Sequence, residues 1–292
     1  MESFVQVTIS GFTLGAMYSI SVIGLALLWG ALRMLNMAQG ALLAVGGYAS
    51  FAAVTLLGLP WYFGLPASMA VGFFSGIVFY YLIVRWTFQT KNFEVNIIIA
   101  TVGLAIVIEN VLIRIFSAYP KKQPFFLDGG IRIHGILLPN NTLLILGISV
   151  AMMLILTWLL TSTRAGRTIR ATAQNPEAAR LVGIRIKRVY AHVLIIAGIV
   201  AAVSGVLLTS LAPVSPHVGH DPMLKAFIIC VIAGLGNIPG AIYSAFLFGF
   251  LESALQYTVS SRYAFPIMLA VVIAVLVWRP YGVFGTPKIV KR

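Results

Sequence analysis

Three ionisable side chains interrupt long apolar runs of this sequence, at Glu109, Arg114 and Glu252. Ionisable groups inside apolar segments are the residue type that proton relays and ion-coupled carriers use. Glu109 and Arg114 are five residues apart and do not share a helix face well, whereas Glu252 and Gln256 are four apart and do. For Glu252 the sequence favours a structural role, as a carboxylate hydrogen-bonded to backbone near a helix break. The alternative is that Glu252 lines a pathway for a solute.

A short loop between two apolar runs holds three potential metal ligands, His217, His220 and Asp221. Histidine nitrogens and a carboxylate oxygen are ligands that Zn²⁺ accepts. The loop also holds three prolines, and no second cluster of ligands accompanies it in the sequence. The sequence therefore favours an ordinary polar turn, and we expect neither a metal site nor a cofactor.

Amides and glycines form two further polar interruptions, one at the start of the second apolar segment and one at residues 234–240. Intramembrane amides usually hydrogen-bond between helices, and the alternative is that they line a pathway. A glycine-rich break exposes backbone polar groups, which membrane proteins tolerate only beside other protein or a water-filled cavity. The candidate residues for a translocation pathway or gate are Asn36, Gln39, Gly40, Glu109, Gly234, Gly236, Asn237, Glu252 and Gln256.

The composition places these polar residues in a membrane protein. The chain has 292 residues, of which 9% are charged and 60% hydrophobic, with a mean hydropathy of +0.99. Soluble domains carry about 25% charged residues, and many apolar runs here approach or exceed the roughly 18 to 20 residues that cross a bilayer as a helix. Because the runs are continuous and not alternating, we expect an all-α polytopic membrane protein in one domain, residues 1–292, and not a β-barrel.

The net charge of +13 would suggest a nucleic acid partner in a soluble protein. In a membrane protein, cations mark the cytoplasmic loops and contact anionic lipid headgroups, so we expect membrane lipid and no nucleic acid as a partner. The single cysteine, Cys230, excludes an intramolecular disulfide. The first residues lack the positive region of a cleavable signal peptide, so we expect the first apolar segment to be a retained span.

About eight or nine transmembrane helices are expected. The expected spans are residues 7–29, 37–58, 61–85, 93–116, 142–161, 190–212, a broken or re-entrant pair within 224–258, and 263–279. The densest cluster of cations, between Arg164 and Arg188, indicates the cytoplasmic side. Alternation then puts the N-terminus outside and the C-terminus inside. Residues 162–189 become a cytoplasmic loop and residues 119–141 an external loop, with a β-hairpin expected at 125–133 around an Asp-Gly-Gly turn.

Two stripes of small residues predict close helix packing, since lipid gives helices no hydrophobic drive to associate. Each stripe repeats every four residues along one helix face. The stripes are Ala197, Ala201 and Gly205, and Ala241, Ala245, Gly249 and Ser253.

A short amphipathic helix is predicted within the cytoplasmic loop. Asn175 is a good N-cap, Pro176 suits the first helical position, and Glu177 complements the positive end of the helix dipole. Its apolar face is small and begins with alanine, which favours contact with a protein over lipid. That face follows helical spacing at Ala178, Leu181, Val182 and Arg185.

Three stretches in order carry a family resemblance that runs from Gly11 to Gly285. The segment Glu177-Ala-Ala, followed three residues later by Gly183, resembles the EAA-type loop of ABC importer permeases, and residues 166–184 resemble its version in the branched-chain amino acid permease family. Residues 36–48 and residues 234–241, the latter followed by Gly249 and Glu252, are similar to that family's two other motifs. Two positions depart from the pattern: residues 193–196 lack the Ile-x-Leu-Pro ending, and Gln39 stands where histidine is common.

The resemblance implies that the cytoplasmic helix couples this chain to an ATPase. The implied coupling residues are Asn175, Pro176, Glu177, Ala178, Ala179, Leu181, Val182, Gly183 and Arg185. The chain has no phosphate loop of the type G-x-x-x-x-G-K-[ST], so ATP hydrolysis would belong to partner subunits and this chain would not be an enzyme.

The implied partners are cytoplasmic ABC ATPase subunits, a second permease that is identical or related, and an external substrate-binding protein. The implied place is the bacterial cytoplasmic membrane. The implied function is ATP-driven import of branched-chain or related amino acids by alternating access. Importers of urea, amides or other small polar solutes are the first alternative. The further alternatives are an ion-coupled secondary carrier and then a channel.

Overall fold

The computed structural model describes the chain except residues 1, 89, 91, 124–128, 134–135 and 286–292. In chain order the elements are α1 (Glu2–Leu32), α2 (Gln39–Phe51), η1 (Ala52–Leu56), η2 (Trp61–Phe63), α3 (Gly64–Phe79), η3 (Tyr80–Val84), α4 (Arg85–Thr87), α5 (Phe93–Phe116), β1 (Gly130–Ile133), β2 (Ile136–Pro139), α6 (Asn140–Ser162), α7 (Arg164–Gln174), α8 (Pro176–Leu181), α9 (Ile186–Thr209), α10 (His220–Ala233), α11 (Ile238–Thr258) and α12 (Ser261–Trp278).

Eight helical segments in the described part of the chain are long and apolar enough to cross a membrane. They cover residues 5–32, 39–56, 61–87, 93–116, 140–162, 186–209, 238–258 and 261–278. The second and third segments contain π turns, η1 and η3, which continue the neighbouring α-helices without a break. The prediction of an all-α polytopic membrane protein is confirmed, and the spans expected from the sequence lie within a few residues of those observed.

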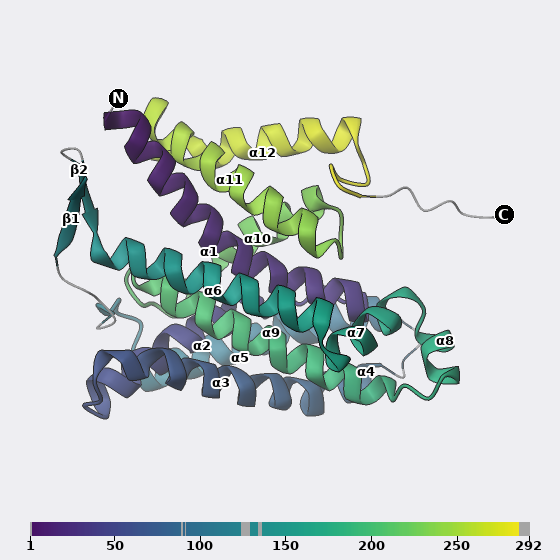
Figure 1. Ribbon diagram of the computed structural model, residues 1–292. Helices are drawn as coiled ribbons and strands as arrows, with labels where there is room; N and C mark the ends of the chain where they lie inside the picture. The colour runs from purple at the N-terminus through teal and green to yellow at the C-terminus, as the bar shows by residue number, and fades with distance from the viewer. Residues whose placement is uncertain (1, 89, 91, 124–128, 134–135, 286–292) are drawn as a thin grey trace.

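The long helices run side by side, so that the bundle has two ends (Figure 1). The hairpin of β1 and β2 lies at one end, and α7 with α8 lies at the other. We call these the hairpin end and the α8 end. The chain begins at the hairpin end, and α12 runs from the hairpin end towards the α8 end.

Both predicted stripes of small residues lie at close helix crossings. The stripe on α11 faces α1, where a side chain at Gly249 would collide with the backbone of Gly15. The stripe on α9 faces α2, where a side chain at Gly205 would collide with the backbone of Leu43. These contacts join α11 to α1 and α9 to α2, and α1, α2 and α9 belong to the most buried spans of the bundle.

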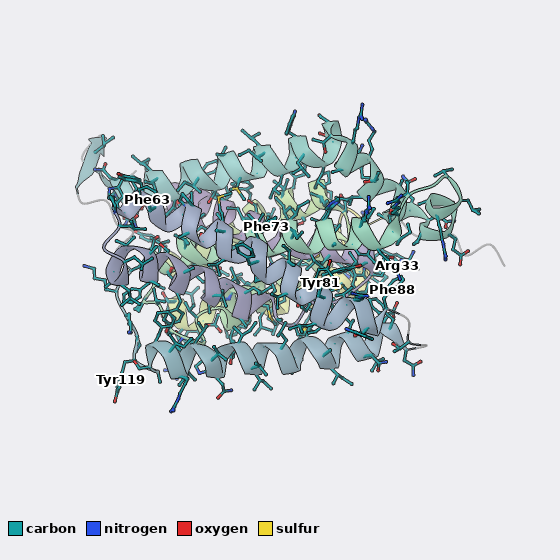
Figure 2. All side chains as sticks on the ribbon, turned by 90° about the horizontal axis from the view of Figure 1, so that it is seen from below. Arg33, Phe63, Phe73, Tyr81, Phe88 and Tyr119 are labelled. Carbon is teal, nitrogen blue, oxygen red and sulfur yellow. The ribbon has the colours of Figure 1, made fainter. Side chains whose placement is uncertain are left out.

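The outer surface of the bundle is apolar, as a lipid-facing surface requires. Phe63, Phe73 and Tyr81 lie along the third span and are 43%, 41% and 54% exposed (Figure 2). The exposed apolar residues on α5, α6 and α12 extend this surface.

The broken pair within 224–258 consists of one short arm and one full span, a choice that the sequence leaves open. Helix α10 has 14 residues, which at about 1.5 Å per residue reaches only ~21 Å, less than the roughly 30 Å of a hydrocarbon core. Gly234 and Gly236 have φ of +86° and +87°, a conformation that L side chains rarely adopt, so glycine permits the sharp reversal between the arms.

The β-hairpin differs from the one expected at residues 125–133. Strand β1 pairs with β2 in antiparallel register, Gly130 opposite Pro139 and Ile133 opposite Ile136. Residues 124–128 lie outside the described part of the chain. Gly130 begins β1 and is not part of a turn. The strand that pairs with β1 is β2, an apolar run that follows residue 133.

Candidate coupling site and translocation pathway

The N-terminal cap of α8 is formed as predicted. The Asn175 side-chain oxygen accepts hydrogen bonds from the backbone N–H groups of Glu177 and Ala178, each at 3.0 Å. Pro176 occupies the first turn, where a missing N–H costs nothing. The cap satisfies two of the donors that every helix start leaves free, so this loop is built to present a defined helix.

The helix ends earlier than the sequence predicted. Gly183 has φ of +87°, its N–H donates to the carbonyl of Arg180, and the N–H of Ile184 donates to the carbonyl of Ala179. This pair of bonds is a Schellman motif, which ends a helix and leaves no room for a further turn. The predicted face from Ala178 to Arg185 is therefore wrong at its end, because Arg185 precedes α9 as its N-cap residue.

The end of α8 exposes its apolar residues. Leu181 is 89% exposed and Val182 is 77% exposed, while Ala179 on the opposite face is buried. Of the predicted coupling residues, the exposed ones available to a partner thus include Glu177, Ala178, Leu181 and Val182. Large side chains held this far out of the fold, on a capped helix, form a surface suited to a protein groove.

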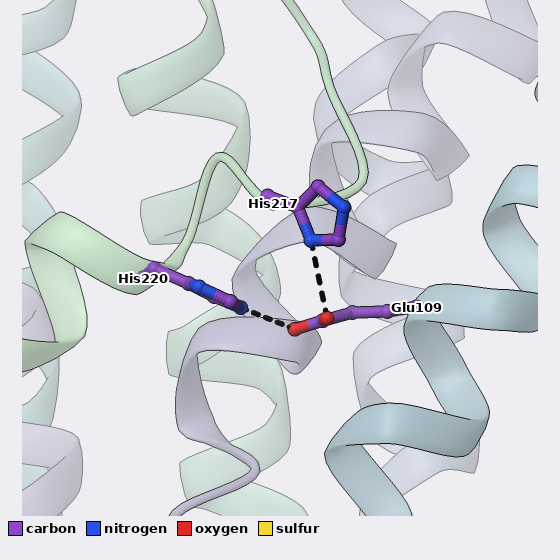
Figure 3. A group of neighbouring side chains, drawn as sticks. All are labelled: Glu109, His217 and His220. Atoms are coloured by element: carbon purple, nitrogen blue, oxygen red, sulfur yellow. Dashed lines mark hydrogen bonds and ion pairs between the residues drawn. The ribbon is translucent and has the colours of Figure 1, made fainter. Parts of the chain in front are cut away.

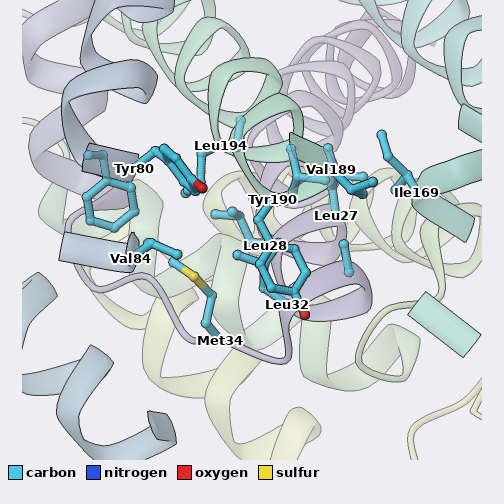
Figure 4. Close-up of a cluster of buried hydrophobic side chains, with 14 of the residues drawn as sticks. Leu27, Leu28, Leu32, Met34, Tyr80, Val84, Ile169, Val189, Tyr190 and Leu194 are labelled. Atoms are coloured by element: carbon cyan, nitrogen blue, oxygen red, sulfur yellow. The ribbon is translucent and has the colours of Figure 1, made fainter. Parts of the chain in front are cut away.

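Helix α7 ties α8 to the bundle. The Thr163 hydroxyl accepts a hydrogen bond from the N–H of Gly166 at 3.0 Å and thereby caps α7. Ile169 on α7 is buried in a hydrophobic cluster with the end of α1 and the start of α9 (Figure 4). Packed side chains therefore connect α7, which precedes α8, to α1 and α9.

A groove of about 470 Å³ lies where α8 begins. It is lined by residues from the ends of α1, α5, α7, α8 and α9, among them Arg33, Glu94, Thr172, Pro176 and Tyr190. The start of α5 thus also lies next to the start of α8.

Glu252 belongs to a buried cluster of polar side chains on three helices. Its carboxylate accepts hydrogen bonds from the Tyr18 hydroxyl at 2.6 Å, the Lys225 ammonium at 2.5 Å and the Gln256 amide at 3.1 Å. Lys225 also donates to the Tyr18 hydroxyl at 3.1 Å. The partners of Glu252 are side chains and not the backbone of the helix break, so the backbone partner expected from the sequence is wrong.

Sequence reasoning missed Tyr18 and Lys225 in this cluster. Tyr18 lies on α1, 234 residues from Glu252, and Lys225 lies on α10, 27 residues from Glu252. The signal that marks Lys225 is its place inside the apolar run Met223-Leu-Lys-Ala-Phe-Ile, where a cation requires a partner.

Asn36 and Gln39, the two amides near the start of α2, are buried among helices. The Asn36 side-chain oxygen accepts from the Ala38 N–H at 3.0 Å, and its amide donates to Gln39 at 3.5 Å. Gln39 is fully buried next to Gly24, and Gly40 lies against the backbone of Gly219. These residues join α1, α2 and the start of α10.

The break between α10 and α11 borders open space. Asn237 caps α11 by accepting from the Gly240 N–H at 3.0 Å, and its amide donates to the carbonyl of Phe284 at 2.8 Å. Gly234, Gly236 and Asn237 line a groove of about 550 Å³ with the segment after α12. The predicted pathway residues therefore do not meet at one point: this group lies at the α8 end, and Glu109 with Glu252 lies in the other half of the helices.

The sequence matches a family model over residues 7–277, described as the permease component of branched-chain amino acid transport systems. The chain belongs to this family. The match covers nearly all of the residues from α1 to α12.

Two curated relatives extend over nearly the whole chain, and a third covers a smaller share. The high-affinity branched-chain amino acid transport system permease protein BraD of Pseudomonas aeruginosa is 28% identical, over 99% of this chain and 98% of its own. The permease protein LivH of Escherichia coli is 29% identical, over 99% and 97%. The autoinducer 2 import system permease protein LsrC of Yersinia pseudotuberculosis is 30% identical, over 73% and 61%. No solved structure matches the chain.

Proposed function

We propose that this chain is the membrane-spanning permease subunit of a binding-protein-dependent ABC importer for branched-chain or related amino acids. The observation that carries the proposal is α8, a capped helix at one end of the bundle with Leu181 and Val182 exposed. A family of transport permeases supplies the context. The chain itself makes and breaks no bond in the solute.

The proposal fixes an orientation and a set of partners. The α8 end faces the cytoplasm, where two ATPase subunits bind α8, and the hairpin end faces outward, where a substrate-binding protein delivers the solute. The N-terminus is then outside and the C-terminus inside, in the bacterial cytoplasmic membrane. A second permease, identical or related, completes the complex, and the cations near Arg164 to Arg188 agree with this orientation.

The mechanism we propose is alternating access driven by the ATPase subunits. When they close on ATP, α8 moves and carries α7 with it. Ile169 passes this motion to the ends of α1 and α9 through the cluster in which it is buried. Two packed helices that change their tilt have discrete arrangements and not continuous ones, so the pathway opens to one side at a time.

The substrate class rests on the names of relatives. BraD and LivH are permeases of branched-chain amino acid systems, and both cover the whole chain. LsrC serves a different solute and matches a smaller share, so a permease for urea, amides or another small polar solute is the second candidate.

Co-purification tests the proposal. The tagged chain is solubilised from native membrane, its partners are identified and ATP hydrolysis is measured. We expect an ABC ATPase with the wild-type chain and its loss with Glu177→Lys, which reverses the charge at the start of α8. Thr258→Lys is the control, because it also places a lysine at an exposed helix terminus but lies at the last residue of α11, away from α8. A chain that purifies without an ATPase contradicts the proposal.

A further inference from the structure

Glu109, in the second half of α5, meets His217 and His220, although it lies more than a hundred residues before both of them in the sequence (Figure 3). One carboxylate oxygen lies 3.1 Å from Nδ1 of His217, and the other lies 2.5 Å from Nε2 of His220. The side chains of the two histidines are 59% and 57% exposed, whereas that of Glu109 is 12% exposed. The two imidazoles are therefore uncovered on one side of the group, and the carboxylate is backed by protein on the other.

The loop that carries the histidines is held on both sides. Val214 is buried, and its backbone exchanges two hydrogen bonds with Lys121, at 2.8 and 2.9 Å. Gly219 lies against the backbone of Gly40, and the His220 N–H donates to the His217 carbonyl at 3.2 Å. Fixed backbone on either side places two imidazoles on one carboxylate, which is the preorganisation that a metal site needs.

The donor set suits Zn²⁺. Two imidazole nitrogens and one carboxylate oxygen are the three protein ligands of an open tetrahedral zinc site, with water in the fourth position. Ligand atoms around such an ion stand ~3.3 Å apart, for bonds of about 2.0 to 2.1 Å. The ligand atoms here all lie within 4.8 Å of one another. Small rotations of the two exposed rings bring them to that spacing.

We infer that Glu109, His217 and His220 form a binding site for Zn²⁺ that links α5 to the loop before α10. Glu109 supplies the carboxylate ligand, whereas the sequence suggests Asp221 for this role. Asp221 lies outside the group. The site anchors α5, a helix that packs little against the rest of the bundle. Its ligands are far from α8, so it is independent of the coupling role and remains open to test if that role fails.

Zinc binding to the purified full chain tests the site. The chain carries an affinity tag without histidine, is freed of metal with a chelator, and is titrated with Zn²⁺ against a chromophoric competitor. We expect one Zn²⁺ per chain, with affinity weakened at least about 10- to 100-fold in Glu109→Gln and in His217→Ala. The matched controls are Glu94→Gln, on the same helix, and His192→Ala, an exposed histidine on α9. Both controls are expected to bind Zn²⁺ as the wild type does.

Two further measurements keep the result unambiguous. Saturating Zn²⁺ raises the melting temperature of the wild-type chain and not that of His217→Ala/His220→Ala, because a ligand that binds only the folded state stabilises it. Both histidines are exposed, so this double variant retains the fold. X-ray absorption is expected to report two imidazole nitrogens and an oxygen. A wild-type chain that binds no Zn²⁺, or binds it as tightly after the double substitution, overturns the inference.

Discussion

The ammonium of Lys225 on α10 lies 2.5 Å from the carboxylate of Glu252 on α11, and the side chains are 18% and 5% exposed. The Tyr18 hydroxyl on α1 hydrogen-bonds to both. This ion pair joins the short arm to the full span and to the central helix. A cation this deep is stable only with its partner, because burying an unpaired charge is costly.

Removing the carboxylate charge is therefore expected to destabilise the chain more than removing both charges. Glu252→Gln leaves the Lys225 ammonium without its counter-charge and costs about 3 kcal/mol. The double variant Lys225→Met/Glu252→Gln restores most of that stability. Thermal unfolding of the purified chain in detergent measures both, and equal destabilisation in the single and double variants would show that the pair is not coupled.

Substitution by alanine is expected to have opposite effects on stability at two glycines, one at a close helix crossing and one on an open helix face. Gly205→Ala places a methyl group into the backbone of Leu43, so we expect a clear fall in melting temperature. Gly103→Ala on α5 meets nothing within 4 Å and gains up to about 1 kcal/mol of helix propensity. The two variants are compared in the same detergent. A neutral Gly205→Ala would contradict the packing of α9 on α2.

The transmembrane helices could be predicted from the sequence because span length and hydropathy are local properties. The close crossings could also be predicted, since small residues repeat every four positions on α9 and α11. The end of α8 was predicted too late because Gly183 ends the helix through its positive φ, while the spacing of apolar residues continues to Arg185. Gly183, three residues before α9, indicates the end of α8 more strongly than the spacing of apolar residues does.

The side-chain clusters could not be predicted, since each joins residues from distant segments. Glu252 meets Tyr18 across 234 positions, and Glu109 meets His217 across 108. Pairing of that kind depends on which helices become neighbours, and periodicity along one helix does not contain this information.

The cap on α8 leads to a prediction about coupling. Asn175→Ala removes the acceptor for two backbone N–H groups and costs about 1 kcal/mol of helix stability. We expect it to weaken the binding of the ATPase subunit several-fold, measured by surface-immobilised binding in detergent. Asn175→Asp keeps the acceptor and is expected to bind as the wild type does. Equal loss in both variants would mean that the amide contacts the partner and does not cap the helix.

The exposed end of α8 leads to a second coupling prediction. Leu181→Ser is expected to reduce ATPase binding by ten-fold or more, because a large apolar side chain at the centre of an interface carries about 2 kcal/mol. Leu211→Ser is the matched control, since Leu211 is 50% exposed and follows the end of α9, whereas α8 precedes the start of that helix. Neither substitution is expected to change the melting temperature. If both weaken binding equally, the interface does not centre on α8.

The most direct test of the account is uptake of radiolabelled leucine into proteoliposomes that contain the purified complex and its binding protein. The account predicts uptake that requires ATP on the α8 side, persists with an uncoupler present and is lost in Glu177→Lys. Uptake that continues without ATP and collapses with the uncoupler would contradict it and assign the chain to the ion-coupled carriers.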